Sequence, residues 1–278
     1  MDILLGLLAA LLAAAAALGC WRLGILLAAR LSRAGGEAAA GVALLLTGGL
    51  VALVNHAPSS LPRRLLLSPA IYFEFCYFLP TAAFFFGLAS RRVPDPRTGR
   101  ALGVLVAVLA GYSAVHAFLA FDARSHPGLS AVPPPSGIQR QTTGWSCGPA
   151  SCVTLLAAHG IRSTEREMGE YTLCYRRRGT TMPRFLRGLA LKLRDAGSRL
   201  RVRAADHLSL RELEAFPKPC LVGLRLTFMV DHAVVVMGVG KDGTWRVADP
   251  IRGTVGPMSL VEMRERFTGE AIALEEGP

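Results

Sequence analysis

The chain has 278 residues, of which 51% are hydrophobic, and its formal net charge is +11 at pH 7. The hydrophobic residues are concentrated before residue 122, whereas residues 123–278 have the mixed composition of a globular domain with its own core. Arginine carries most of the positive charge, and no stretch interleaves arginine with aromatic residues as a nucleic-acid-binding surface does. We therefore expect no nucleic-acid partner.

Four apolar runs precede residue 122, and each has about the length that crosses a bilayer, roughly 17 to 23 residues. They cover about residues 3–19, 38–54, 66–88 and 101–121. The first run lacks a positively charged start and a clear cleavage site, so we interpret it as an anchor and not as a signal peptide. The sequence predicts an all-α transmembrane region of about four helices in residues 1–122. We therefore expect a multi-pass integral membrane protein, with the bacterial inner membrane as its expected location.

The placement of arginine predicts how these spans are oriented. The loop after the first span carries Arg30 and Arg33, with Arg22 near its edge. The loop after the third span carries four arginines: Arg91, Arg92, Arg97 and Arg100. The loop between the second and third spans carries only Arg63 and Arg64. Cytoplasmic loops are enriched in Lys and Arg, so the first and third loops are expected in the cytoplasm. Both termini and the domain after residue 122 are then extracytoplasmic, unless the number of spans is odd.

Glu74 is the acidic residue within the third run. An acid inside a span is costly and often functional. Here aromatic residues surround it, which is typical of the belt at a membrane interface (Tyr72, Phe73, Phe75, Tyr77 and Phe78). We interpret Glu74 as interfacial, with a membrane function of Glu74 and the spans as an alternative.

Residues 123–136 are predicted to form a linker, because Pro127, Gly128 and Pro133-Pro134-Pro135 make a stiff spacer. Residues 137–278 are predicted to form helices and then an antiparallel sheet, an α+β layout. Helices are expected at about 147–159, 164–175, 181–197, from 209, and 259–269. Strands are expected at about 199–205, 219–226, 232–240, 245–249 and 271–274.

Cys147 stands where a loop passes into the first of these helices. Pro149 suits the first helical turn, and the positive end of the helix dipole lowers the pKa of a thiol at this position. The position indicates a reactive thiolate, with a buried structural cysteine as the alternative. No two of the six cysteines have Cys-x-x-Cys spacing, so a structural zinc site is not indicated. A cysteine nucleophile implies no metal or organic cofactor. A Cys174–Cys220 disulfide can be neither derived nor excluded.

His232 and Asp249 are candidate partners for this thiolate. His232 begins an apolar strand, and the strand after the 241–243 turn ends at Asp249. A hairpin around this turn brings both residues to the same end of neighbouring strands, where a carboxylate can orient an imidazole. Asp231 is the alternative carboxylate. Adjacent strand residues point to opposite faces, which favours Asp249.

The order of these motifs resembles the bacteriocin-processing cysteine peptidases, papain-like enzymes that cut leader peptides after a double glycine. The stretches that carry the resemblance are Gln141, Cys147-Gly148-Pro149-Ala150, Gly179-Thr180-Thr181, His232-Ala233-Val234-Val235, Asp249-Pro250, Ser259-Leu260 and Phe267-Thr268-Gly269. The resemblance implies that Cys147 is the nucleophile, His232 the general base and acid, Asp249 the orienting residue, and Gln141 an oxyanion donor. It also implies a papain-like fold for residues 137–278.

The sequence therefore predicts a membrane-anchored cysteine peptidase that hydrolyses a peptide or protein substrate, with a membrane transporter as a possible partner. Relatives of this family are usually the N-terminal part of an ATP-driven exporter. This chain has its apolar runs first and contains no Gly-x-x-x-x-Gly-Lys-Ser/Thr loop, so it is no such exporter by itself. The alternatives are a catalytically silent peptide-binding module and an acyl transferase in which an amine outcompetes water.

Overall fold

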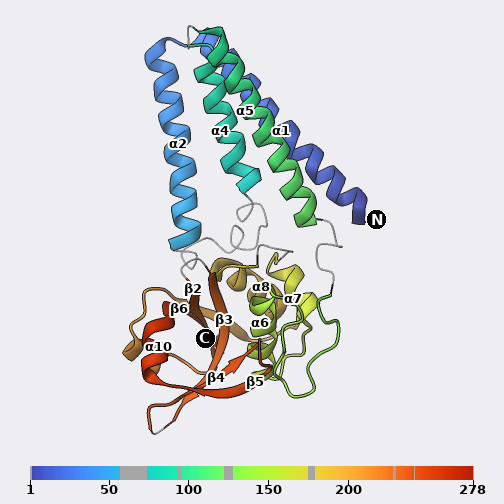
Figure 1. Cartoon of the computed structure of the whole chain (residues 1–278), viewed down its shortest axis with the longest axis vertical. Coiled ribbons are helices and arrows are strands. Elements are labelled where there is room, and N and C mark those ends of the chain that lie inside the picture. Colours follow the sequence, from blue (N-terminus) through green and yellow to red (C-terminus); the bar gives the residue numbers. More distant parts are fainter. Residues whose placement is uncertain are drawn as a thin grey trace. The chain divides into compact units, whose positions relative to one another are not determined.

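The computed structural model describes residues 2–56, 74–92, 95–121, 128–174, 179–227, 230–240 and 242–277. The chain divides into two compact units, Met1–Ser125 and His126–Pro278. Figure 1 shows a helical unit at the N-terminus and a mixed α and β unit at the C-terminus. Each unit is described separately below.

The first unit contains four described helices: α1 (Asp2–Arg30), α2 (Arg33–His56), α4 (Glu74–Ser90) and α5 (Pro96–Phe121). Within the described residues, Leu7–Arg30 and Pro96–Phe118 are long and apolar enough to cross a membrane. These two segments correspond to the first and fourth predicted spans. The side chains of residues 50–78, including that of Glu74, lie outside the described part of the structure. This range includes much of the second and third predicted spans.

The predicted end of the first span near residue 19 is wrong. Helix α1 continues without a break through Trp21 and Arg22 to Arg30, because the apolar residues resume at Leu23 and nothing in between stops a helix. Arg22 therefore lies on a helix and not in a loop. The connection to α2 is short, consisting of Leu31 and Ser32.

Helices α1 and α4 approach closely through two glycines. A Cβ atom on Gly24 would lie 2.3 Å from the Phe84 carbonyl oxygen, and one on Gly87 would lie 2.2 Å from the Trp21 carbonyl oxygen. Small residues at such a crossing allow backbones to pack directly, which is the usual way that apolar helices associate in a membrane. A second small-residue cluster, with Ala17, Ala83 and Ala110, joins α1, α4 and α5.

The second unit begins with its helices: α6 (Cys147–Ala158), α7 (Glu165–Tyr171) and α8 (Met182–Asp195). They precede a sheet with two further short helices between its strands, α9 (Leu210–Ala215) and α10 (Leu260–Arg266). The strands are β1 (Leu200–Ala205), β2 (Cys220–Thr227), β3 (Val230–Val239), β4 (Trp245–Asp249), β5 (Thr254–Met258) and β6 (Phe267–Glu276). The sheet has the order β1-β6-β2-β3-β4-β5, with every neighbouring pair antiparallel. The predicted α+β class is thus confirmed.

The end of the domain differs from the sequence prediction in two ways. The predicted strands do not include β5, which contains Gly256 and Pro257; as an edge strand it tolerates proline. Phe267, Thr268 and Gly269 were expected to close a helix, but they begin β6. Pairing of Phe267 with Leu224 of β2 extends β6 to this point, a long-range contact that local sequence does not reveal.

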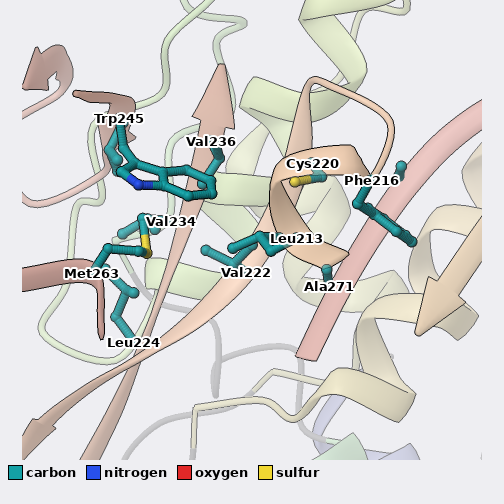
Figure 2. Packing of buried hydrophobic residues seen from close by; sticks show 12 residues of the cluster. Leu213, Phe216, Cys220, Val222, Leu224, Val234, Val236, Trp245, Met263 and Ala271 are labelled. Atoms are coloured by element: carbon teal, nitrogen blue, oxygen red, sulfur yellow. The ribbon is translucent and has the colours of Figure 1, made fainter. Parts of the chain in front are cut away.

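The hydrophobic core of the sheet lies between its strands and helices α9 and α10. Figure 2 shows Val222, Val234, Val236 and Trp245 from three neighbouring strands packed with Met263 of α10. All five are at most 1% exposed, and burial of each such side chain contributes roughly 1.5–3 kcal/mol. This packing fixes β3 and β4 relative to each other, and these two strands carry His232 and Asp249.

Candidate active site

Cys147 is the first residue of α6, as the sequence predicts. The next residue, Gly148, is buried so tightly that a Cβ atom would lie 2.3 Å from Phe185 Cε1 and 2.5 Å from Thr180 Cγ2. A glycine is therefore required for the start of α6 to pack against α8. Nine of the twelve residues of α6 are buried, so the helix is a rigid central element that fixes the position of the thiol.

Helix α6 is joined to β3 by a hydrogen bond beside the site. The hydroxyl of Ser151, one helical turn after Cys147, donates to the carbonyl oxygen of Ala233 at 2.8 Å. Both groups are buried, so the bond is shielded from water and contributes about 1 kcal/mol. It holds Cys147 next to His232. Sequence reasoning missed Ser151, although a polar residue four positions after Cys147 in an apolar helix is a detectable signal.

His232 and Asp249 are in direct contact. His232 Nε2 lies 2.8 Å from Asp249 Oδ1, and the His232 side chain is 4% exposed. Val235 of β3 is paired with Ala248 of β4, which places Asp249 beside the start of β3, as the predicted hairpin requires. The carboxylate is held in turn by the Ile251 N–H, which donates to Asp249 Oδ1 at 2.9 Å.

The electrostatics of these three residues favour an ion pair of thiolate and imidazolium. Burial raises the pKa of the Cys147 thiol, but a hydrogen bond with His232, the Ala233 N–H and the charge of His232 outweigh burial, and the pKa is lowered. Burial lowers the pKa of His232, but the hydrogen bonds and charges of Asp249 and Cys147 raise it to about 9. Burial raises the pKa of Asp249, yet contact with His232 and the Ile251 N–H leaves it lowered.

A comparison with protein-family models supplies the family. Residues 136–278, just over half of the chain, match the model of the Peptidase C39 family. The chain belongs to the Peptidase C39 family. It is accordingly a cysteine-type peptidase, and residues 136–278 are its C39 domain. No curated protein matches the chain.

Solved peptidase domains are similar to the C39 domain. The peptidase domain of Streptococcus ComA, a bifunctional ABC transporter of a quorum-sensing pathway, is 22% identical with a TM-score of 0.43, covering 50% of this chain and 97% of that one. A double-glycine-motif protease of an AMS/PCAT transporter, solved with its leader peptide, is 19% identical with a TM-score of 0.41, covering 53% and 94%. The N-terminal C39-like domain of a toxin-secretion ATP-binding protein from Vibrio parahaemolyticus is 12% identical with a TM-score of 0.38, covering 49% and 99%.

Gln141 of the C39 domain lies in the loop before α6. Its backbone N–H donates to the Pro250 carbonyl oxygen at 2.8 Å, which connects this loop to the turn after Asp249. Its side-chain Nε2 donates to the Thr143 carbonyl oxygen at 2.9 Å. Within the described part of the chain, Gln141 Oε1 is buried and has no hydrogen-bond partner. The amide has one further N–H group available for a ligand.

The other cysteines of the C39 domain differ from Cys147. Burial raises the pKa of Cys152 and of Cys174 above their usual range, and burial raises the pKa of Cys220 to about 11. All three are buried free thiols, so Cys174 and Cys220 do not form a disulfide. Cys147 is the described cysteine of this domain whose pKa is lowered, which fits a nucleophile and not a structural core residue.

Among the described residues, no hydrogen bond joins Asp231 or the remaining histidines of the C39 domain to Cys147, His232 or Asp249. Asp231 is exposed, and its backbone lies opposite Arg225 in the antiparallel pair of β2 and β3. Burial first, and then the charges of Asp206 and Asp231, raise the pKa of Glu270. His159 follows the last turn of α6, and His207 lies in a turn with a φ of 59°. Among the described residues, no group of three or more His, Cys, Asp or Glu side chains is arranged to hold a metal ion.

Proposed function

We propose that Cys147, His232 and Asp249 form the catalytic triad of this peptidase, with Gln141 as the oxyanion donor. The observation that carries the proposal is the 2.8 Å contact of His232 Nε2 with Asp249 Oδ1, because it leaves the other ring nitrogen of His232 for Cys147. Figure 1 shows α6 next to β3, the two elements that carry the nucleophile and the base. In this arrangement the thiol contacts the imidazole, and the imidazole contacts the carboxylate. Acyl transfer through a covalent intermediate uses a nucleophile, a base and an orienting carboxylate connected in this way.

The reaction proceeds through a thioester. The Cys147 thiolate attacks the carbonyl carbon of the scissile peptide bond, and the carbonyl oxygen becomes an oxyanion. The His232 imidazolium then gives its proton to the departing amine, and the carbonyl forms again as a thioester. Neutral His232 next takes a proton from water, which attacks the thioester and releases the acid product. Asp249 keeps the imidazole ring in one orientation throughout.

Two N–H groups are suited to stabilise the oxyanion. One is the backbone N–H of Cys147 at the start of α6, which has no partner within the helix. The other is the second amide N–H of Gln141, whose first N–H is fixed on Thr143. A donor of this kind is worth roughly 3 kcal/mol in the transition state. No metal or organic cofactor takes part in the proposed reaction.

Membership of the Peptidase C39 family supports the proposed substrate class. We propose a leader or precursor peptide that is cut after a double glycine, as in the enzymes that the sequence resembles. Two glycines fit a narrow site because they place no side chain between the substrate backbone and the enzyme. A membrane transporter is the proposed partner, because the peptidases that the sequence resembles are usually part of an ATP-driven exporter.

We further propose that residues 1–122 anchor the enzyme in a membrane by four spans, with 123–136 as the linker to the peptidase domain at 137–278. The apolar segments of α1 and α5 support spanning. Arg92 Nη2 donates to the Ser32 carbonyl oxygen at 3.4 Å, so the α1–α2 connection, with Arg30 and Arg33 at its two helix ends, and the segment after α4 lie at the same end of the helical unit. The positive-inside rule puts this end in the cytoplasm and the peptidase domain on the extracytoplasmic side.

The pH profile of hydrolysis tests the proposed function. The full chain in detergent should release aminomethylcoumarin from a peptide ending in Gly-Gly-aminomethylcoumarin. Activity requires a deprotonated Cys147 and a protonated His232, so it rises through the lowered pKa of Cys147 and falls through the pKa of His232 at about 9. In Asp249→Asn, the charge that raises the pKa of His232 is absent. The alkaline limb should move to lower pH, and kcat should fall roughly 10²- to 10⁴-fold.

Asp242→Asn is the matched control, since Asp242 is exposed in the β3–β4 turn, where it accepts hydrogen bonds from Thr244. It should leave the profile unchanged. Absence of coumarin release from the full chain at any pH would contradict the peptidase function. An unchanged alkaline limb in Asp249→Asn would contradict the assignment of Asp249.

A further inference from the structure

Glu165 is a buried carboxylate outside the proposed triad. It is the first residue of α7 and is 0% exposed. Burying a carboxylate costs several kcal/mol unless hydrogen bonds compensate for the lost water. A glutamate at a fully buried position therefore needs hydrogen-bond donors around its carboxylate.

Three hydrogen bonds to Glu165 come from two segments that are distant in the sequence. The backbone N–H of Thr142 donates to Glu165 Oε1 at 3.0 Å, and the Thr142 hydroxyl donates to Oε2 at 2.7 Å. The backbone N–H of Ser130 also donates to Oε2, at 3.0 Å. The α7 backbone returns this contact, since the Arg166 N–H donates to the Ser130 carbonyl oxygen at 2.9 Å. One carboxylate thus holds both a residue within the predicted linker and the loop before Cys147.

Thr142 directly follows Gln141, so Glu165 acts on the backbone that carries the oxyanion donor. The same loop is fixed at two other points. The Gln139 N–H donates to Thr154 Oγ1 of α6 at 3.0 Å, and the Gln141 N–H donates to the Pro250 carbonyl oxygen. Glu165 supplies the third attachment, on the side of α7. Among the described residues, the hydrogen bonds to Glu165 are the ones that attach the segment from Thr142 onward to α7.

We infer that Glu165 is a positioning residue for the oxyanion site: it accepts both polar hydrogens of Thr142 and thereby holds the amide of Gln141 in place. This inference rests on the proposed role of Gln141. A charge-assisted bond is shorter and about twice as strong as a neutral one, which explains a carboxylate here in place of an amide or hydroxyl. Glu165 touches neither substrate nor nucleophile and acts through the loop.

Glu165→Gln is the direct test. Whichever way the new amide is turned, its NH₂ group faces the backbone N–H of Thr142 or of Ser130, so one of these donors loses its acceptor. Because an oxyanion donor acts in the transition state, we expect kcat for the Gly-Gly-aminomethylcoumarin peptide to fall about 10- to 100-fold, with KM changed less than about 3-fold. The rate of Cys147 alkylation by iodoacetamide should not change, since this reaction forms no oxyanion.

Four further variants separate positioning from loss of folding. Thr142→Val removes the hydroxyl bond at an exposed residue and should lower kcat by a smaller factor in the same direction. Glu167→Gln is the matched control: Glu167 lies two residues further along α7 and binds Lys192 and Ser163, so kcat should not change. The double variant Gln141→Ala with Glu165→Gln should have a kcat less than about 3-fold below that of Gln141→Ala alone, because the donor that Glu165 positions is already absent.

The outcomes distinguish this inference from the proposed function. If Gln141→Ala leaves kcat unchanged, the oxyanion role of Gln141 fails, and the role of Glu165 fails with it. If Gln141→Ala lowers kcat but Glu165→Gln does not, or if the two losses multiply in the double variant, the positioning role alone is overturned. If Glu165→Gln slows alkylation of Cys147 as much as hydrolysis, the residue supports the whole domain, which also overturns the inference. Should that variant not fold, Thr142→Val decides by the same readouts.

Discussion

Replacing Cys147 by alanine should lower kcat for the Gly-Gly-aminomethylcoumarin peptide by about 10⁵-fold or more, because no other described group can form the thioester. Loss of the nucleophile in a hydrolase triad typically costs about 10⁶ in kcat. The folded state should be retained, since alanine favours the first turn of α6 as well as cysteine does and Cys147 is not part of the buried core. Coumarin release and the thermal unfolding midpoint measure the two effects.

Cys220→Ala is the control for Cys147→Ala. Cys220 is fully buried in β2 within the sheet core, so its truncation should reduce the free energy of unfolding by about 1 kcal/mol while kcat stays within about 2-fold. Hydrolysis by Cys147→Ala at more than a trace of the original rate would contradict the assignment of the nucleophile. Loss of activity in both variants would point to damage of the fold.

Replacing His232 by alanine should lower kcat by about 10⁴-fold. In the proposed mechanism His232 both favours the Cys147 thiolate and carries the proton to the leaving amine, and general acid–base catalysis alone contributes typically 10²- to 10⁴-fold. Raising the pH should restore only part of the loss, because hydroxide can form the thiolate but cannot protonate the amine. Rates measured between pH 6 and 10 distinguish these two contributions.

His159→Ala is the matched control for the histidine. His159 caps the end of α6, at the opposite end from Cys147, and its replacement should leave kcat unchanged within about 2-fold. If His232→Ala and His159→Ala behave alike, the proposed general base is wrong. Full recovery of His232→Ala at high pH would mean that His232 activates the thiol without protonating the amine.

The parts of the site that lie on regular elements could be predicted from the sequence. The loop, glycine and proline around Cys147 predict a helix that starts at the cysteine, and α6 starts there. The turn at 241–243 predicts a hairpin that aligns His232 with Asp249, and the two side chains are 2.8 Å apart. Both predictions rest on local rules, namely helix-start signals and the register of a short hairpin.

The parts that depend on contacts between distant segments could not be predicted. The attachment of Thr142 to Glu165 joins residues 23 positions apart, and the Ser151 bond to Ala233 joins residues 82 apart. The stretch Thr164-Glu165-Arg166-Glu167 has the sequence pattern of a capping box, in which the Glu167 side chain would bond to the Thr164 backbone. In the structure Thr164 accepts the Glu167 N–H, but the Glu167 side chain binds Ser163 and Lys192 instead. A neighbouring serine and Lys192 of α8 replace the bond to the Thr164 backbone.

The most direct test of the account is the rate at which iodoacetamide labels each cysteine of the full chain at pH 6, followed by mass spectrometry, with His232→Ala alongside. An unperturbed thiol is only about 0.3% ionised at this pH. The account predicts labelling of Cys147 at least about 10-fold faster than of Cys152, Cys174 or Cys220, and a loss of this advantage in His232→Ala. Labelling of Cys147 no faster than of Cys152 or Cys220, or a rate indifferent to His232, would contradict a base-activated nucleophile at position 147.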